Sequence, residues 1–223
     1  MPSLKRFAQG ELGLGRVEAV SDGVFAIVVT LLVLELKVPV LHDRRGTREL
    51  GHQLVDLLPK FLSWLISFII VCKFWLNHHH PLMFARHVTY GMIWLNSIFL
   101  MGQSFIPFPT ALMGEYPMNA LAVSLFGAVM AINTLLFIAL QSYILRNLLK
   151  PEMIGAIVPH LARKSFVGVV SYLLGVAATF FDVRIAFVLL RADTAVFYHA
   201  STTANREFIS KFVEESTIWH PLV

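Results

Sequence analysis

Six long apolar stretches constrain the fold of this chain more than any other feature. They cover residues 23–39, 54–76, 90–110, 118–145, 166–181 and 183–198. A helix crosses the hydrocarbon core of a bilayer with about 20 mostly apolar residues. Only 14% of the 223 residues are charged, whereas soluble domains carry about 25%. The sequence therefore predicts an all-α, polytopic membrane protein with six transmembrane helices in residues 1–198 and a cytoplasmic C-terminal tail in residues 199–223.

The distribution of Lys and Arg predicts how these helices are oriented, because positively charged loops stay in the cytoplasm. With a cytoplasmic N-terminus, the cytoplasmic side holds Lys5, Arg6, Arg16, Arg86, Arg146, Lys150, Arg163, Lys164, Arg206 and Lys211. The opposite side holds only Arg44, Arg45, Arg48 and Arg184. Both termini are therefore expected in the cytoplasm. Since the basic residues lie between apolar runs and form no single patch, the bilayer, and not nucleic acid, is the expected partner.

The first apolar stretch has charged residues close to both of its ends. Its fully apolar part covers residues 23–34, with Asp22 before it and Glu35 and Lys37 after it. Such a segment is too short to cross the hydrocarbon core unaided. Charged groups are tolerated at membrane depth inside a bundle or beside water, not against lipid. The first helix is therefore expected to face protein or a water-filled space.

One face of this helix carries Ile27, Leu31 and Leu34 at helical spacing, with Thr30 beside them. From spacing alone, ordinary packing against a neighbouring helix explains such a stripe best. Identical copies around a rotation axis would instead turn the stripe into stacked aliphatic rings. Rings of this kind form a hydrophobic gate, which controls ions by dewetting. The residues alone leave both interpretations open.

Two short polar or proline-containing segments have local explanations. Ser21 and Asp22 are good helix N-caps, because their side chains accept bonds from the first free N–H groups. Capping alone would account for them.

Pro107 and Pro109 are expected to end or kink the helix in residues 90–110, because proline lacks the N–H that a helix interior needs.

Neither an enzyme nor a metal site is expected. No G-x-S-x-G motif surrounds Ser21, and too few acids and bases share a stretch to suggest intramembrane catalysis, so no catalytic residue is predicted. His78, His79 and His80 are adjacent, and consecutive side chains on a helix point about 100° apart. They cannot ligate one metal well, so we predict no metal and no cofactor.

The segment from Arg16 to Gly23 reads R-x-x-x-V-S-D-G and resembles R-x-x-x-F-S-D-G, the signature of the transmembrane protein 175 family of potassium channels. The following VFAIVVTLLVLELKVP is similar to the first helix of that family. Residues 75–80 and 94–110 also resemble its second and third helices. Val20 replaces the aromatic residue of the motif. This change removes the packing of that ring but leaves the polar residues in place.

The resemblance implies a homotetramer with four first helices around a central pore that passes potassium ions. Ile27 would form the main constriction, Leu31 and Leu34 further layers, and Thr30 would help to prefer potassium. Without a ring of carbonyl groups, aliphatic side chains discriminate between ions only by the cost of dehydration. We therefore expect a moderate preference for potassium over sodium.

The resemblance also assigns a structural role to the polar motif. Contacts to neighbouring helices would hold the first helix in register, and the residues implied are Arg16, Ser21, Asp22, Gly23, His78, His79 and Trp94. Either His78 or His79, together with Trp94, would be the partner of the Ser-Asp pair. The single copy of the motif matches the prokaryotic members, which implies a prokaryotic plasma membrane.

Two other functions stay open from the sequence. A secondary transporter would show internal repeats and helices broken at the midplane, and the only candidate break is at Pro107 and Pro109. A membrane scaffold would assemble without transporting anything. Ion flux that needs no coupled gradient would favour the channel over both.

Overall fold

The computed structural model describes residues 13–43, 46–149 and 174. This part of the chain is helical, with one isolated bridge between Ala85 and Leu149. Its helices follow in the order α2 (Leu14–Leu32), the short 3₁₀ turn η1 (Val33–Glu35), α3 (Thr47–Asp56), α4 (Leu58–Phe84), α5 (Tyr90–Ser104), α6 (Pro107–Glu115) and α7 (Ala120–Asn147). Apart from Leu174, the fifth and sixth predicted spans and the predicted tail lie outside the described residues.

Three helical segments in the described part are long and apolar enough to cross a membrane. They are Leu14–Glu35 with 22 residues, Leu58–Phe84 with 27 residues and Ala120–Asn147 with 28 residues. At 1.5 Å per residue, each exceeds the thickness of about 30 Å that a hydrocarbon core presents. The first, second and fourth predicted spans are thus confirmed as long apolar helices, and the chain is a multi-pass membrane protein.

The third predicted span is broken into α5 and α6. Pro107 and Pro109 carry no backbone N–H, so an unbroken ladder of hydrogen bonds is impossible there. The chain turns tightly instead, with the N–H of Phe105 donating to the carbonyl of Gly102 at 3.3 Å. The Nδ2 group of Asn133, on α7, donates to the same carbonyl at 3.1 Å. This side chain satisfies a carbonyl that the break removes from the helix ladder, as a kinked membrane helix requires.

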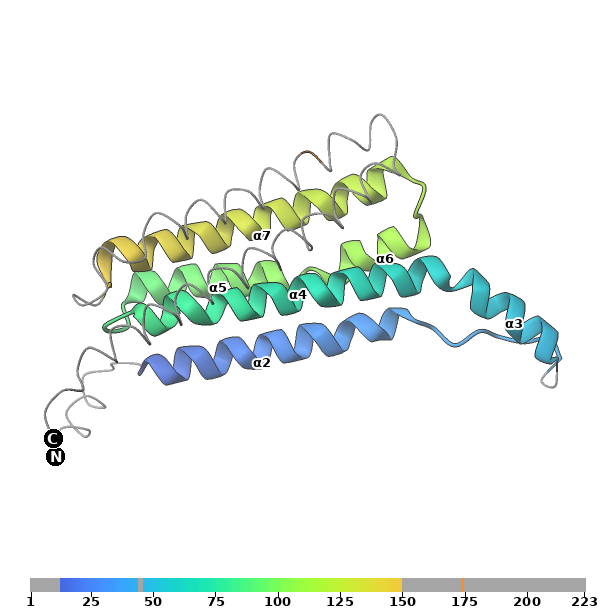
Figure 1. Cartoon of the computed structure of the whole chain (residues 1–223), viewed down its shortest axis with the longest axis horizontal. Helices are drawn as coiled ribbons and strands as arrows, with labels where there is room; N and C mark the ends of the chain where they lie inside the picture. Colours follow the sequence, from blue (N-terminus) through green and yellow to red (C-terminus); the bar gives the residue numbers. More distant parts are fainter. Residues whose placement is uncertain (1–12, 44–45, 150–173, 175–223) are drawn as a thin grey trace, which may run out of the picture.

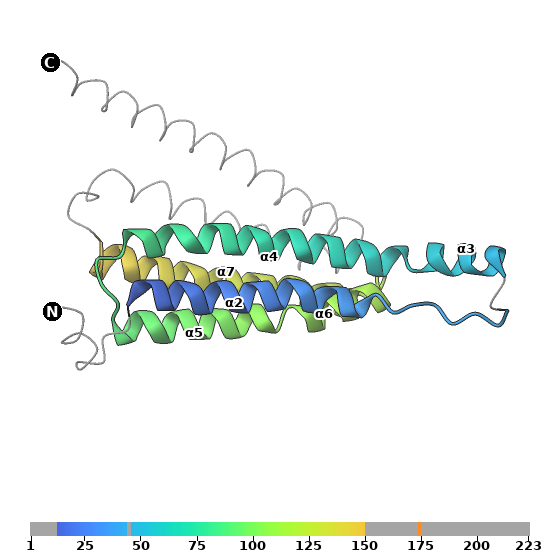
Figure 2. The same cartoon turned by 90° about the horizontal axis from the view of Figure 1, so that it is seen from below.

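The described helices form a bundle with α2 at its front and α7 at its back. Viewed from the α2 side, α4 and α5 lie on opposite sides of α2, and α7 lies behind (Figure 2). The packing agrees with this view, because α2 contacts α4 and α5, whereas α7 contacts α4, α5 and α6. Among the residues that the structure describes, helices therefore cover only one face of α2.

The first helix begins earlier than the apolar run suggests. The apolar stretch starts at Gly23, yet α2 begins at Leu14 with Gly13 as its N-cap. Ser21 and Asp22 therefore lie within the helix and cap nothing. The Oγ of Ser21 donates to the carbonyl of Val17, one turn back, at 2.8 Å. The interpretation of this pair as N-caps is wrong, because polar residues at membrane depth are satisfied here by helix and neighbour contacts.

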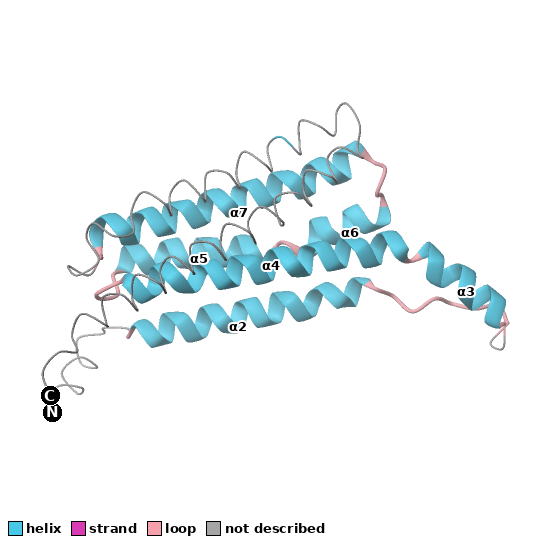
Figure 3. Ribbon diagram, in the orientation of Figure 1, coloured by secondary structure: helices cyan, strands magenta, loops and turns pink. Residues whose placement is uncertain are grey.

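Helix α3 was not predicted from the sequence. It projects beyond the end of the bundle (Figure 1), and an extended loop connects it to η1 (Figure 3). None of its residues is buried. The loop is tied to the helix by Glu49, whose carboxylate accepts hydrogen bonds from the backbone N–H groups of His42 at 3.0 Å and Asp43 at 3.3 Å.

An aromatic cluster fills the bundle beside the polar motif. Phe99, on α5, is fully buried and has ring contacts to Phe25, Phe74, His78 and Phe137 at centroid distances of 5.4–6.1 Å. In lipid, helices associate through close packing and interhelical hydrogen bonds, since lipid tails are as apolar as the side chains. Phe99 therefore joins α2, α4 and α7 at one height of the bundle.

Candidate pore helix and polar motif

The covered face of α2 is defined by five buried residues at helical spacing. These are Val17, Ser21, Phe25, Val28 and Leu32. They recur at intervals of three and four residues, which is the pattern of a single helical face. This stripe, and not the stripe of Ile27 and its neighbours, packs against the other described helices.

The predicted pore residues occupy the opposite face. Ile27, Leu31 and Leu34 are 59%, 42% and 66% exposed in the single chain. Thr30 is also exposed, and its Oγ1 donates to the carbonyl of Ile27 at 2.8 Å. A hydroxyl has one hydrogen and two lone pairs, so the oxygen of Thr30 can still accept a hydrogen bond. Ile27, Thr30 and Leu31 thus lie together on the uncovered side of α2, and Leu34 follows them on η1.

Ser21 is the buried centre of the polar motif. The Nδ2 group of Asn96, on α5, donates to Ser21 Oγ at 3.0 Å, and Asn96 Oδ1 lies 2.7 Å from Nε2 of His78, on α4. Because Ser21 gives its hydrogen to Val17, its oxygen accepts from Asn96. The amide of Asn96 is thereby oriented with Oδ1 toward His78, so His78 Nε2 carries a proton. Three helices meet at this chain of hydrogen bonds.

His78 is positioned by rings as well as by Asn96. Its imidazole stacks on Phe99 with centroids 5.4 Å apart and an interplanar angle of 14°, and the ring of Phe25 lies 5.6 Å away. His78 is buried, whereas His79 and His80 are exposed. Of the two histidines that the resemblance implied, His78 therefore joins the Ser-Asp motif. Within the described residues, no group of three His, Cys, Asp or Glu side chains is arranged to hold a metal ion.

Asp22 has a partner that the sequence interpretation missed. The indole N–H of Trp75, on α4, donates to Asp22 Oδ1 at 2.9 Å. Trp94, the expected partner, is 68% exposed on α5. The signal for Trp75 was present in the sequence, since it opens the same W-L-N-H-H-H run that contains His78. Spacing could not decide between two tryptophans on different helices.

Four members of the predicted motif remain outside this network. Arg16, Gly23, His79 and Trp94 are exposed, and in the described part of the chain none of them hydrogen-bonds to Ser21 or Asp22. A Cβ added to Gly23 would meet nothing within 4 Å. The structure therefore brings together Ser21, Asp22 and His78, and it adds Asn96 and Trp75 to them.

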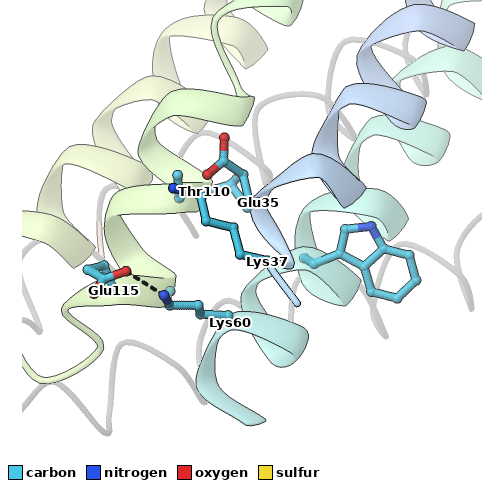
Figure 4. Close-up of a pocket in the computed structure, with 8 residues that line it drawn as sticks. Glu35, Lys37, Lys60, Thr110 and Glu115 are labelled. Carbon is cyan, nitrogen blue, oxygen red and sulfur yellow. Dashed lines mark ion pairs between the residues drawn. The ribbon is translucent and has the colours of Figure 1, made fainter. Parts of the chain in front are cut away.

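A small pocket of mixed charge lies at the other end of α2, away from the polar motif (Figure 4). Its lining residues come from η1 and the following loop, α4 and α6, and they are Glu35, Lys37, Lys60, Trp64, Thr110, Ala111, Gly114 and Glu115. Lys60 pairs with Glu115 at 2.6 Å. The sequence did not predict this pocket. Acidic and basic side chains from the η1 region, α4 and α6 thus lie close together at the end of the first helix.

The structure defines a multi-pass α-helical membrane protein whose first helix is covered on one face and held by a buried polar network. Residues 16–107, which contain this helix and network, match the family described as "Endosomal/lysosomal potassium channel TMEM175". A potassium channel of Chryseobacterium sp. is 33% identical over 77% of this chain and 85% of its own length. The chain belongs to the TMEM175 family, which is a family of ion channels and not of enzymes.

Further relatives agree with this assignment. A crystal structure of a lysosomal potassium-selective channel TMEM175 homolog from Chamaesiphon minutus superposes with a TM-score of 0.74 and 31% identity, covering 84% of this chain and 97% of that one. A potassium channel of Chamaesiphon minutus is 40% identical, and the match spans 62% of its length. The human endosomal/lysosomal proton channel TMEM175 is 39% identical over 38% of this chain and 18% of its own length.

Proposed function

We propose that this chain forms a homotetrameric channel in a prokaryotic plasma membrane that conducts potassium passively through a pore lined by α2. The observation that carries the proposal is the uncovered stripe of Ile27, Leu31 and Leu34, which α4 and α5 flank but do not cover. The potassium channels among the relatives support the choice of ion.

The position of this stripe weakens its interpretation as ordinary packing. Packing of α2 within the subunit uses the other face, from Val17 to Leu32. No other described residue of the chain covers this face, which is therefore available to further copies of the chain. Fourfold symmetry places this face around an aqueous axis, where the aliphatic side chains of four copies form rings.

The proposed pore discriminates between ions by dehydration. Ile27 forms the narrowest ring, and Leu31 and Leu34 add further layers toward the η1 end. An aliphatic ring offers an ion no replacement for its water, so the more weakly hydrated potassium ion passes more easily than sodium. Thr30 lies among these rings with a free acceptor on its hydroxyl oxygen. Its oxygen compensates part of the lost hydration.

The polar network gives this pore a fixed geometry. Ser21, Asn96 and His78 connect α2 to both helices that flank it. Trp75 holds Asp22 from the α4 side. Hydrogen bonds between membrane helices fix their rotation and height, because unsatisfied polar groups are costly in hydrocarbon. In the proposed channel, this network sets which face of α2 meets the axis.

The test is reconstitution of the purified protein into potassium-loaded liposomes, with one dye for potassium flux and one for internal pH. A channel of the proposed kind gives potassium flux down its gradient without a coupled ion. Flux that requires a proton or sodium gradient would show a transporter. Proton current without potassium current would match the human relative instead. A stable tetramer without any flux would show a scaffold.

A further inference from the structure

Two residues of the predicted motif have no partner within the described part of the chain. His79 is exposed on α4, and Trp94 is 68% exposed on α5. Their neighbours Trp75 and His78 both hydrogen-bond inside the subunit. An indole N–H and an imidazole at membrane depth normally find a polar partner, because the hydrocarbon offers none.

His79 and Trp94 lie at the same height in the membrane. The hydrogen bond between His78 and Asn96 fixes a common height on α4 and α5. The two helices run in opposite directions (Figure 1). His79 follows His78 by one residue and Trp94 precedes Asn96 by two, so both are displaced toward the same end of the bundle, by about 1.5 Å and about 3 Å.

The two residues lie on the two flanks of the subunit. The exposed stripe on the α4 flank contains Leu62, Leu65, Ile69, Leu76, His79 and Met83. The exposed stripe on the α5 flank, which continues into α6, contains Tyr90, Trp94, Ile98, Met101, Phe105 and Phe108. Figure 2 shows these helices on opposite sides of α2. In a ring with α2 nearest the axis, the α4 flank of one copy faces the α5 flank of the next, since cyclic symmetry joins unlike surfaces.

We propose that Trp94 of one subunit contacts the partner subunit's His79, and that this pair closes the ring at the height of the Ser21 network. This contact rests on the tetramer proposed above. The indole supplies a donor only, whereas a neutral imidazole supplies an acceptor nitrogen. The imidazole and the indole are both flat aromatic rings, so the two can also stack, as aromatic pairs at interfaces do. The indole of Trp94 thereby contacts a polar, aromatic side chain instead of lipid.

The test uses two tagged versions of the full chain in one cell, both with Cys72→Ser to remove the native thiol. One version carries His79→Cys and the other carries Trp94→Cys, so any bond between them joins two chains. A short bismaleimide is added to membranes, and the covalent species that carries both tags is quantified. The matched control replaces His79→Cys with Leu62→Cys, which lies on the same flank about 25 Å further along the helix.

The expected result is a two-tag species several-fold more abundant for the 79/94 pair than for the 62/94 pair. Equal yields from both pairs, in subunits that co-purify as tetramers and conduct potassium, would overturn the contact and leave the proposed channel intact. A 79/94 pair that gives no two-tag species, in subunits that co-purify as tetramers, would overturn it as well. Chains that neither assemble nor conduct would overturn the channel and this contact together.

A second measurement avoids cysteine. The temperature of tetramer dissociation is compared for His79→Ala, Trp94→Ala and the double variant. A shared contact predicts that the double variant loses no more than the larger single loss, because neighbouring residues act non-additively. Additive losses would contradict a direct contact. Trp94→Phe, which keeps the ring and removes the donor, separates stacking from hydrogen bonding.

Discussion

The indole N–H of Trp75 donates to Oδ1 of Asp22 at 2.9 Å and joins α4 to the uncovered side of α2. Together with the bond between Asn96 and Ser21, it holds α2 from both flanking helices. One bond lies on the buried face of α2 and the other beside the exposed face. Two contacts on different sides of one helix oppose its rotation, which a single contact does not.

Replacing Trp75 with Phe tests this role. Trp75→Phe keeps an aromatic ring on α4 and removes only the donor to Asp22. We expect a loss of about 1 kcal/mol in the stability of the bundle, the usual net value of one hydrogen bond, and a poorer yield of tetramer. Thermal denaturation in detergent measures the first and native mass spectrometry the second. Asp22→Asn, which keeps an acceptor at the same place, is the milder control. An unchanged melting temperature in Trp75→Phe would contradict the role assigned to this bond.

Asn96→Leu should be more damaging than the loss of Trp75. The substitution has nearly the same volume but leaves Ser21 without a donor and His78 without an acceptor, both in the buried interior. Each unsatisfied buried group costs about 1–3 kcal/mol. We expect a large fall in melting temperature and loss of potassium flux. Ser97→Ala is the neighbouring control, because within the described residues that exposed hydroxyl bonds only to its own helix. Similar effects of the two variants would refute the network.

Long apolar helices were predictable, whereas their ends and partners were not. Hydropathy located the helices in residues 58–84 and 120–147 because twenty or more apolar residues leave few alternatives. It placed the start of α2 at Gly23, because Arg16, Glu18 and Asp22 interrupt the apolar residues between Leu14 and Gly23. It missed α3 for the same reason. Helical spacing found the stripe of Ile27, but only the three-dimensional packing shows that this stripe is the uncovered one.

The polar motif was predictable in part. The resemblance supplied Ser21, Asp22 and His78 as residue types at known positions. Asn96 and Trp75 lie 75 and 53 residues away from their partners in sequence. No local periodicity encodes such pairs, because they depend on the relative height of different helices. A single sequence therefore identified the anchor residues on α2 and left their partners undetermined.

The loop between η1 and α3 should loosen in acid. Hydrogen bonds from the backbone N–H and side chain of His42, and from the N–H of Asp43, lower the pKa of Glu49 from its ordinary value. A lowered folded-state pKa means that this carboxylate stabilises the loop above its unfolded-state pKa, and the effect disappears as pH falls through the folded-state value. Proteolysis of the loop is expected to speed up in that acidic range. Glu49→Gln should be cut rapidly at neutral pH as well, and a rate that stays slow there would contradict this role.

Gly102→Ala tests the break between α5 and α6. A Cβ at this position would lie 2.7 Å from Oδ1 of Asn133, the side chain that satisfies the carbonyl of Gly102. Overpacking of this kind costs about 1–3 kcal/mol, so the variant should melt at a lower temperature. Gly15→Ala is the control, because a Cβ there meets nothing within 4 Å and alanine favours a helix over glycine. A Gly102→Ala protein as stable as Gly15→Ala would show that Asn133 moves freely.

Ile27→Ala should widen the proposed constriction and admit sodium. Removing most of the aliphatic side chain at the head of the stripe enlarges the narrowest ring, so ions pass with more of their water and the dehydration cost separates them less. We expect larger currents and a lower potassium-to-sodium permeability ratio, measured from reversal potentials in bilayers. Leu121→Ala is the matched control, because Leu121 is 76% exposed on α7, at the back of the bundle. Equal currents and equal reversal potentials in both variants would show that Ile27 does not line the pore. Another face of α2 would then have to line it.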